Sequence, residues 1–350
     1  MKESRVLLGM SGGTDSSVSA AILKNQGFHV IGVTFLFSNL ENENKQNIAD
    51  AKEIAESLNI NHHILDLREE FNEKIIIRFI KEYSEGKTPF PCAFCNPQLK
   101  FNRLYKLATE LNCDYISTGH YARIIKHNKL KYISKGNDPE KDQSFFLWGL
   151  EKHIIERLIF PLGEFTKNQI RKYAKHNGFT RIAKKKDSLG ICFINSRDYR
   201  NYLKNNGLEM GEGNFKDRAG KILGTHGGIM NYTIGQRRGL GINFNKPLFV
   251  TEINADKNEI ILGDFNQLYK NRIVIKDTHF IDLENIREEK TFIVKIRYRL
   301  QDTPCKIRIL EKNNAEIFLL EPLAMVAKGQ TAVFYENERV IGGGFIKSSE

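Results

Sequence analysis

The N-terminal half of the chain alternates between short apolar runs and segments whose apolar residues recur at helical spacing. Val6-Leu7-Leu8 is the first apolar run, and residues 29–36 form a second one rich in β-branched side chains. The segment between them places Val18 and Ile22 on one helical face, and Gly27 ends that helix. The alternation continues through a helix over 43–58, a strand over 62–67, a helix containing Phe71, Ile75, Phe79 and Tyr83, a helix over 97–112 and a strand over 115–118. It predicts an α/β fold with a doubly wound parallel sheet, whose ligand lies at the carboxyl ends of the strands.

Two local signals follow this region. Residues 122–134 predict a hairpin that turns at His127-Asn128. Thr166 and Gln169 have the spacing of a capping box, which predicts a helix that ends near Gly178.

The pattern then changes. Residues 207–241 contain ten glycines, too many for helices, so a boundary falls near residue 205. From about residue 270, apolar and polar residues alternate as in strands, which predicts a small β-barrel. We therefore expect an α/β domain over 1–205, a glycine-rich β domain over 206–269 and a C-terminal barrel over 270–350.

Length, composition and charge narrow the function classes. With 350 residues, 41% of them hydrophobic, the chain can fold into two or three domains with substantial cores. No run approaches the ~18 apolar residues of a membrane span, and no signal peptide is recognisable, so we expect a cytoplasmic protein without a membrane partner. A net charge of +11 favours a polyanionic partner such as nucleic acid. Five cysteines, an odd number, argue against a structural disulfide framework.

The segment Gly9–Ser17 reads Gly-Met-Ser-Gly-Gly-Thr-Asp-Ser-Ser and lies where a predicted strand becomes a helix. Adjacent glycines let consecutive backbone N–H groups face one concavity, and the helix N-terminus adds partial positive charge. The segment has neither the Gly-Lys-Ser/Thr of a Walker A loop nor the spacing of a dinucleotide fingerprint. The plain alternative is a glycine turn in which Asp15 or Ser16 caps the helix. The complete string predicts a phosphate-binding loop, and it resembles the pyrophosphate loop of the ATP pyrophosphatases.

Two cysteines follow a proline-rich stretch, residues 86–96. Its prolines predict a loop as far as Pro97, which suits the first turn of the next helix. Cys92 and Cys95 would then lie beside a helix N-terminus, where thiolates are stabilised. A Cys-x-x-Cys pair is compatible with half a zinc site, with a redox or sulfur-handling pair, or with chance. No second pair with zinc-ligand spacing occurs in the sequence, which disfavours zinc.

Two later segments carry candidate chemistry. Gly119-His120 comes directly after the predicted strand over 115–118, at the same sheet edge as the phosphate loop. Residues 184–193 combine three lysines, Asp-Ser and Cys192, and the lysines favour the thiolate form of that cysteine. A basic triplet is usually a solvated surface. Because Asp-Ser and Cys192 follow these lysines, the segment predicts a loop that binds phosphate and exposes a thiol.

Together these segments resemble the bacterial tRNA-specific 2-thiouridylases, over nearly the whole chain. The shared motifs occur in the family's order at Ser11 to Ser17, Thr88 to Asn96, Thr118 to Tyr121, Lys141 to Ser144, Lys186 to Phe193, Tyr232 to Gly239, Arg297-Tyr298 and Gly329-Gln330. The resemblance implies a sulfurtransferase that uses ATP to thiolate the wobble uridine of tRNA. It further implies adenylation of the uracil C2 oxygen, with pyrophosphate leaving into the loop and Mg²⁺ assisting. The barrel would resemble the second domain of translation elongation factors and would contact tRNA.

The resemblance also assigns roles to residues. Cys192 would carry a persulfide received from a cysteine desulfurase or a sulfur-relay protein, and Cys95 would form a transient disulfide with it. ATP would contact Gly9, Met10, Ser11, Gly12, Gly13, Thr14, Asp15, Ser16, Phe35 and Gly119. The target base and the rest of the tRNA would contact Phe90, Pro91, Cys92, His120, Lys141, Asp142, Gln143, Arg297, Tyr298 and Gln330.

The chain departs from the family's pattern at two positions. Many relatives have Asp where this chain has Cys92. Many also have Met where it has Phe35, and we expect the aromatic ring of Phe35 to pack on adenine in its place. The change at Cys92 opens the alternative that Cys92, Cys95 and Cys192 ligate a 4Fe–4S cluster with one open iron.

Two different functions also have to be weighed against thiolation. A small-molecule ligase of the same loop superfamily would use the phosphate loop, but it has no need of the three cysteines. A non-catalytic tRNA-binding or sulfur-carrier protein would use the cysteines or the basic surface, but it has no need of an intact phosphate loop. The sequence therefore favours the thiolation enzyme over both.

Overall fold

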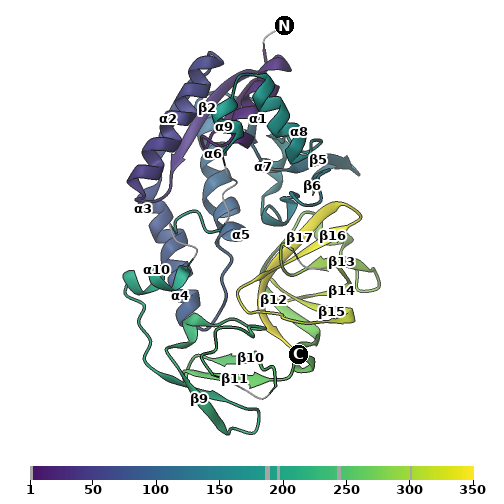
Figure 1. The fold of residues 1–350 in the computed structure, drawn as a ribbon. Coiled ribbons are helices and arrows are strands. Elements are labelled where there is room, and N and C mark those ends of the chain that lie inside the picture. Colours follow the sequence, from purple (N-terminus) through teal and green to yellow (C-terminus); the bar gives the residue numbers. More distant parts are fainter. Residues whose placement is uncertain (1–2, 186–189, 195–197, 243–245, 300–301) are drawn as a thin grey trace. The chain divides into compact units, whose positions relative to one another are not determined.

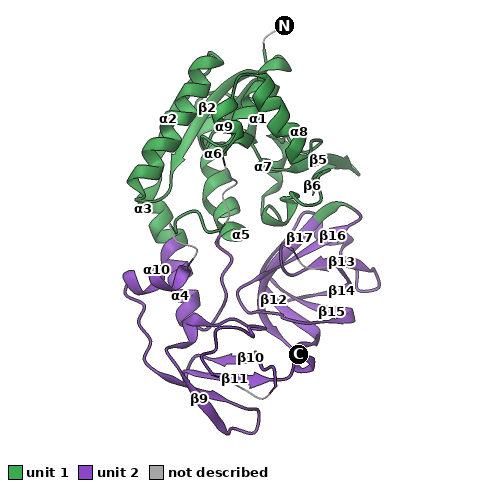
Figure 2. Ribbon diagram, viewed as in Figure 1, with its two compact units in different colours: residues 1–75, 92–195, 338–340 green, residues 76–91, 196–337, 341–350 purple. Residues whose placement is uncertain are grey.

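A computed structural model of the chain describes residues 3–185, 190–194, 198–242, 246–299 and 302–350. It contains the elements labelled in Figure 1 and divides into two compact units. Figure 2 shows unit 1, which comprises residues 1–75, 92–195 and 338–340, and unit 2, which comprises residues 76–91, 196–337 and 341–350. None of the helices in these described ranges is both long enough and apolar enough to cross a membrane.

Unit 1 is built on a five-stranded parallel sheet with the strand order β3-β2-β1-β4-β7. Its strands are β1 (Arg5–Gly9), β2 (His29–Leu36), β3 (Asn61–Asp66), β4 (Tyr115–Thr118) and β7 (Leu158–Ile159). The chain runs outward from β1 to β2 and β3, and then returns to β4 on the other side of β1. Such a reversal leaves a crevice at the carboxyl ends of β1 and β4, where open α/β sheets bind their ligands. The predicted doubly wound sheet is confirmed.

Helices cover this sheet and connect its strands. The helical elements of unit 1 and its borders are α1 (Thr14–Asn25), α2 (Glu41–Ser57), α3 (Arg68–Phe71), the π-helical turn η1 (Asn72–Ile76), α5 (Pro91–Cys95), the π-helical turn η2 (Asn96–Lys100), α6 (Phe101–Glu110), the 3-10 turn η3 (Ser144–Phe146), α7 (Lys152–Glu156), α8 (Lys167–His176) and α9 (Thr180–Ala183). The helix α8 begins with the predicted capping box, because Thr166 and Gln169 each accept the other's backbone N–H with their side chains.

The predicted hairpin is formed by β5 (Ala122–His127) and β6 (Leu130–Lys135). It turns at Asn128 and Lys129, one residue later than expected, and both residues have positive φ angles. That conformation suits a two-residue hairpin, whose twist matches the strands. Unit 1 also includes the beginning of β17, where Arg339 pairs with Ser134 of β6.

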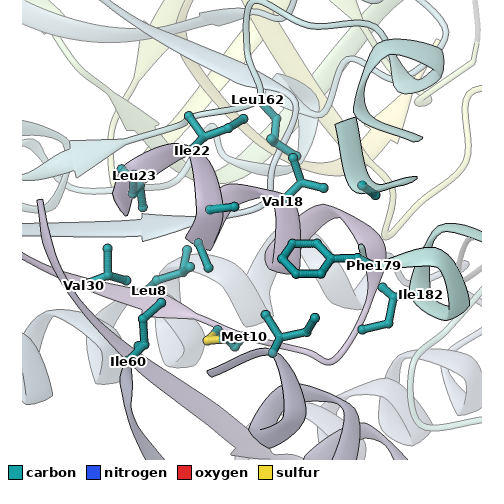
Figure 3. Close-up of a cluster of buried hydrophobic side chains, with 14 of the residues drawn as sticks. Leu8, Met10, Val18, Ile22, Leu23, Val30, Ile60, Leu162, Phe179 and Ile182 are labelled. Carbon is teal, nitrogen blue, oxygen red and sulfur yellow. The ribbon is translucent and has the colours of Figure 1, made fainter. Parts of the chain in front are cut away.

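The core of unit 1 lies between the sheet and the helices α1, α8 and α9. Figure 3 shows Leu8 and Val30 from the sheet, Val18 and Ile22 from α1, and Phe179 beside them. Burial of each such side chain contributes about 1.5–3 kcal/mol. Because Leu8 and the neighbouring Met10 belong to this cluster, the start of the glycine loop is anchored in the core.

Unit 2 contains α4 (Ile77–Ser84), α10 (Tyr199–Asn205), a small four-stranded sheet and a β-barrel. The small sheet has the order β10-β11-β8-β9, with β8 (Gly213–Lys216), β9 (Ile222–His226), β10 (Phe249–Asn254) and β11 (Glu259–Gly263). The barrel strands are β12 (Lys270–Phe280), β13 (Phe292–Lys295), β14 (Thr303–Leu310), β15 (Asn314–Leu323), β16 (Thr331–Glu336) and β17 (Arg339–Ser349), and the 3-10 turns of the unit are η4 (Ile229–Asn231), η5 (Phe265–Leu268) and η6 (Leu283–Asn285). The order β12-β15-β14-β13-β16-β17 is closed by pairing of β12 with β17, so the predicted barrel is confirmed.

Candidate functional site

The glycine loop lies at the carboxyl end of β1, at the position where the strand order reverses. It connects β1 to α1, and its neighbour at the same sheet edge is the Gly119 turn after β4. A Cβ added at Gly119 would lie 2.9 Å from both the Asp15 carbonyl carbon and the Ser16 nitrogen. The two loops therefore touch backbone to backbone, and only glycine allows this approach.

The side chains of Ser16 and Ser17 form hydrogen bonds with backbone groups of the loop. Ser16 Oγ accepts the Ser11 N–H at 3.1 Å, and Ser17 Oγ donates to the Gly13 carbonyl oxygen at 2.9 Å. Gly13 is the N-cap of α1, so no side chain caps this helix, in contrast to the alternative in which Asp15 or Ser16 does so. Uncapped N–H groups at a helix N-terminus form a ready site for an anion. The geometry fits the phosphate-binding loop that the sequence predicts.

The Asp15 carboxylate is occupied by partners from two other segments of unit 1. Both of its oxygens lie 2.8 Å from Lys167 Nζ, and Oδ1 also accepts the Tyr121 hydroxyl at 2.7 Å. The Lys167 side chain is only 10% exposed, so this ion pair is largely shielded from solvent. The pair ties α1 to the first residue of α8 and neutralises the one carboxylate of the loop.

The Cys-x-x-Cys segment differs from the prediction. We expected a loop as far as Pro97, but α5 begins at Pro91 and continues into η2 and α6 without a break at either cysteine. Proline is compatible with the first turn of a helix, where its missing N–H would have no partner within the helix. Cys92 and Cys95 therefore lie within helical structure rather than on a loop before it. The π-helical turn η2 follows directly, a feature that is common at functional sites.

The expectation that these thiols are stabilised as thiolates is also wrong for this conformation. Burial raises the pKa of Cys92 and raises the pKa of Cys95 to about 12, and Lys100 only partly opposes these shifts. Cys192 is exposed, yet desolvation by nearby protein atoms, followed by the proximity of Cys92, raises its pKa to about 11. Cys92 and Cys95 are therefore protonated at neutral pH. Of the lysines expected near Cys192, Lys186 lies outside the described residues, as do Asp187 and Ser188.

A row of aromatic rings runs from the end of β2 to the neighbour of Cys192. Phe35 packs on Phe37 with ring centroids 5.6 Å apart, Phe37 on Phe71 at 5.2 Å, and Phe71 on Phe193 at 5.5 Å. Phe71 and Phe193 are buried, whereas Phe35 is half-buried. The row anchors Cys192 through the next residue in the chain. Contact of Phe35 with adenine stays a prediction.

The side chain of His120 packs against aromatic residues of its own unit. Its half-buried ring contacts Phe101 and Phe160, with centroids 5.7 and 6.1 Å away, and Nδ1 lies 2.7 Å from the Thr118 hydroxyl oxygen. Burial, assisted by the positive charge of Lys100, lowers the pKa of His120 to about 3. The side chain is therefore neutral under physiological conditions, and its contact with tRNA stays a prediction.

This environment predicts a specific dependence of stability on pH. Below its ordinary pKa of 6.5, His120 gains a proton in the unfolded chain but stays neutral in the folded protein until about pH 3. The free energy of unfolding should therefore fall as the pH decreases through this window, and His120→Asn should make that fall shallower. Denaturant unfolding at pH about 7.5 and about 4.5 measures the difference, with the exposed His29→Asn as control. Equal pH dependence in His120→Asn and the unsubstituted protein would contradict this environment.

The segment Lys141–Gln143 is bound mainly by its own unit. The buried Asp142 accepts the backbone N–H of Gly136 at 3.1 Å and both the N–H and the hydroxyl of Ser144 at 3.0 Å. The Gln143 side chain accepts the Tyr121 N–H at 3.0 Å, and its backbone N–H donates to the Tyr121 carbonyl at 2.8 Å. Asp142 and Gln143 thus fix the turn that holds Tyr121, while Lys141 is half-buried.

Three motifs that are distant in sequence meet at Thr88 within unit 2. Thr88 and Thr233 approach hydroxyl to hydroxyl at 2.6 Å, and the Thr88 N–H donates to the Lys328 carbonyl at 2.8 Å. The Gln330 side chain donates to the Thr88 carbonyl, also at 2.8 Å. These contacts hold the segment that leads to Phe90 and Pro91, and they leave Gln330 engaged with protein.

Two kinds of arginine occur in the motifs of unit 2. Arg297 is half-buried, its guanidinium lies 3.4 Å from the Ile234 carbonyl oxygen, and burial lowers its pKa. The neighbouring Tyr298 is half-buried too. Arg237 and Arg238 are exposed, as the glycine-rich loop around them predicts. Contacts of Arg297 and Tyr298 with tRNA stay predictions.

Comparison with known proteins covers the whole chain. Residues 4–196 match the model of a tRNA methyl transferase HUP domain, residues 200–264 that of a tRNA methyl transferase PRC-barrel domain, and residues 270–346 that of an aminomethyltransferase β-barrel domain. The tRNA-specific 2-thiouridylase MnmA 3 of Phocaeicola vulgatus is 40% identical over 99% of this chain and 95% of its own length. MnmA 1 of Bacteroides fragilis is 43% identical over 100% of this chain and 99% of its own. The chain belongs to the tRNA-specific 2-thiouridylase family.

Among solved structures, a 4-thiouridine synthetase–RNA complex with bound ATP matches 52% of this 2-thiouridylase family member and 43% of its own chain. The TM-score is 0.36 and the sequence identity is 22%.

Among the described residues, which include Cys92, Cys95 and Cys192, no group of three His, Cys, Asp or Glu side chains is close enough to hold a metal ion. In a 4Fe–4S cluster each cysteine binds a different iron, so this finding concerns a single ion and the cluster stays an alternative.

Sequence reasoning does not reveal several contacts of this site. The sequence indicates Lys167 only as part of a capping-box helix, yet this lysine forms the ion pair with Asp15. No motif singles out Asp50, although it binds a lysine that touches the glycine loop. Asp50 is a charged residue on the buried face of α2, and charged residues are rarely buried without a partner. The sequence of this polar helix does not show which of its faces is buried, so Asp50 cannot be singled out from sequence.

Proposed function

We propose that this chain is an ATP-dependent tRNA sulfurtransferase that converts the wobble uridine of tRNA to 2-thiouridine. The proposal is carried by one observation: a single compact unit holds both an uncapped glycine loop suited to pyrophosphate and the two cysteines Cys95 and Cys192. The family to which the chain belongs supports the same reading. The proposed reaction needs both features, because the loop would bind the ATP that activates the uridine and the cysteine pair would deliver the sulfur.

Activation comes first, because the C2 carbonyl of uracil is a poor electrophile. The C2 oxygen attacks the α-phosphorus of ATP, a new O–P bond forms, and pyrophosphate leaves. The loop from Ser11 to Ser16 would hold the departing pyrophosphate through N–H groups and hydroxyls, and Phe35 would lie against adenine.

Mg²⁺ would accompany ATP and neutralise charge on the phosphates. Because Asp15 is already paired with Lys167 and Tyr121, the protein offers few carboxylate ligands here. Most ligands of the ion would therefore be phosphate oxygens and water, as is common for Mg²⁺ at nucleotide sites.

Sulfur transfer then follows in two steps that balance atoms and electrons. The terminal sulfur of a Cys192 persulfide attacks C2, and AMP leaves with the former C2 oxygen. The Cys95 sulfur attacks Cys192 Sγ, which breaks the S–S bond, forms a Cys95–Cys192 disulfide and leaves sulfur on C2. A dithiol reductant restores both thiols, and a cysteine desulfurase or a sulfur-relay protein reloads Cys192.

The tRNA would be bound by residues of both units. The residues proposed for this contact are Phe90, Pro91, Cys92, His120, Lys141, Asp142, Gln143, Arg297, Tyr298 and Gln330. Their roles differ, because Asp142, Gln143 and Gln330 also position backbone segments within their own units. The exposed Arg237 and Arg238 are suited to phosphates of the tRNA backbone.

Release of pyrophosphate tests this proposal against the competing functions. With ATP and tRNA that has an unmodified wobble uridine, we expect pyrophosphate release to rise at least ~100-fold over the rate without tRNA, because the C2 oxygen is the attacking group. A matched tRNA with cytidine at the wobble position should give only the basal rate.

The competing functions predict different results when pyrophosphate release and tRNA modification are both measured. A small-molecule ligase would release pyrophosphate without regard to tRNA, and a carrier protein would release none. A methyl transferase, the activity named in the description of the matching family models, would modify tRNA with S-adenosylmethionine in the absence of ATP. Any of these three outcomes would contradict the proposal.

A further inference from the structure

The glycine loop is held by α9 and by Lys185, which lies just after that helix. Lys185 Nζ donates to the Gly12 carbonyl oxygen at 2.8 Å, and the Thr14 hydroxyl donates to the Ile182 carbonyl at 2.7 Å. Both contacts join the loop to residues more than 160 positions later in the chain. The loop conformation therefore depends on these residues as well as on β1 and α1.

Lys185 is itself held by a buried carboxylate. Asp50 on α2 is fully buried, forms an ion pair with Lys185, accepts the Gln46 side-chain N–H at 2.8 Å and lies 2.6 Å from Arg181 Nη2. Burial alone would raise the pKa of Asp50, but the hydrogen bonds from Lys185, Gln46 and Arg181 together hold it below its ordinary value. The carboxylate is therefore charged at neutral pH and fixes the Lys185 ammonium against the loop.

The backbone of α2 reinforces this arrangement. A Cβ added at Gly12 would lie 2.4 Å from the Asn47 carbonyl oxygen, so α2 packs directly on the Gly12 backbone. Gly12 also has a φ of +68°, which places its peptide in a conformation that favours glycine. One side of the Gly12 peptide is thus filled by α2 and Lys185.

The planarity of the peptide bond gives this contact a consequence for the loop. In a trans peptide, the carbonyl of one residue and the N–H of the next point in opposite directions. Since Lys185 holds the Gly12 carbonyl, it fixes the direction of the Gly13 N–H at the N-terminus of α1. That N–H belongs to the set expected to meet an anion.

We propose that Lys185, anchored by Asp50, is a positioning residue that orients the Gly12–Gly13 peptide for the pyrophosphate portion of ATP. This inference rests on the proposed function, because it assumes that the loop binds the phosphates of ATP. Lys185 acts through the backbone, so its effect is confined to ligands that carry phosphates in the loop.

The inference predicts a selective loss of affinity. The variant Lys185→Met should bind ATP and inorganic pyrophosphate about 10- to 100-fold more weakly, the scale of a lost hydrogen bond to a charged group, and should bind adenosine as the unsubstituted protein does. Lys185→Arg should restore part of the loss, because the charge and donors remain. Asp50→Asn should show the same selectivity, and combining it with Lys185→Met should add little further loss, because both substitutions break one unit.

Titration calorimetry of the full chain with ATP, pyrophosphate and adenosine separates the possible outcomes. The control is Lys172→Met, which removes one positive charge from an exposed position on α8 that belongs to none of the motifs. An equal loss in Lys172→Met would assign the effect to overall charge and overturn the inference, as would equal loss for adenosine, which would indicate a general structural defect. Unchanged pyrophosphate affinity in Lys185→Met would overturn the inference alone, whereas failure of the unsubstituted protein to bind ATP would overturn the proposed function with it.

Discussion

Replacing either Cys95 or Cys192 with serine should lower formation of 2-thiouridine by a factor of about 10³ or more, because each removes one partner of the sulfur-transfer step. Both variants should retain pyrophosphate release in the presence of tRNA, since adenylation precedes the arrival of sulfur. Mass spectrometry of nucleosides from digested tRNA measures the first quantity, and a coupled pyrophosphate assay measures the second.

Two further cysteine substitutions make this experiment decisive. Cys113→Ala serves as the control, because Cys113 is buried in unit 1 and belongs to none of the motifs. Cys92→Ser separates the two sulfur mechanisms: the persulfide route predicts that thiolation persists, and the 4Fe–4S alternative predicts its loss together with bound iron after anaerobic purification. Thiolation that persists in Cys95→Ser or Cys192→Ser would exclude that cysteine from the mechanism.

Replacing Gly12 with alanine should abolish ATP binding, with an affinity loss of at least ~100-fold. The new Cβ would lie 2.4 Å from the Asn47 carbonyl oxygen, and the positive φ of Gly12 adds about 1–2 kcal/mol of backbone strain for any L-residue. The loop must move to relieve this clash, and its N–H groups then no longer face one anion. Equilibrium binding of ATP measures the effect.

Gly27→Ala is the matched control for this substitution. Gly27 also has a positive φ, at the end of α1, but a Cβ there would have no atom within 4 Å. This variant should lose about 1–2 kcal/mol of unfolding free energy while its ATP affinity stays unchanged. ATP affinity that is preserved in Gly12→Ala would show that phosphates do not bind at this loop.

Much of the fold could be predicted because local pattern and tertiary structure agree. The apolar run before Gly9, the helical face with Val18 and Ile22, and the capping box at Thr166 all describe residues whose partners are close in sequence. The alternating strands of the barrel were equally visible. In each case, the burial pattern of an element is the same as the one that its own residues indicate.

The segment around Cys92 and Cys95 shows where this reasoning fails. The rule that proline interrupts helices does not apply to a first turn, so Pro91 begins α5 rather than preventing it. The thiolate expectation fails for a different reason: burial acts more strongly on the pKa values of Cys92 and Cys95 than the positive charge of Lys100 does. Burial depends on residues that are far away in sequence, and the spacing of cysteines does not reveal it.

The contacts of the glycine loop mark a second limit. The sequence predicts that the loop binds phosphate, but it does not reveal that Lys167 and Tyr121 hold Asp15 or that Asp50 holds Lys185. These are pairs of opposite charges, or of donors and acceptors, that lie more than 100 positions apart. The strand order, which brings the ends of β1 and β4 together, places Tyr121 beside Asp15.

The most direct test of the account follows the oxygen atom that sulfur replaces. A tRNA with oxygen-18 at C2 of the wobble uridine is incubated with the enzyme, ATP, cysteine, a cysteine desulfurase and a dithiol reductant. Mass spectrometry then measures the oxygen-18 content of the AMP product. Adenylation of the C2 oxygen predicts one labelled oxygen in AMP for each 2-thiouridine formed. Formation of 2-thiouridine with unlabelled AMP would contradict the account, because ATP would then activate some group other than the uracil carbonyl.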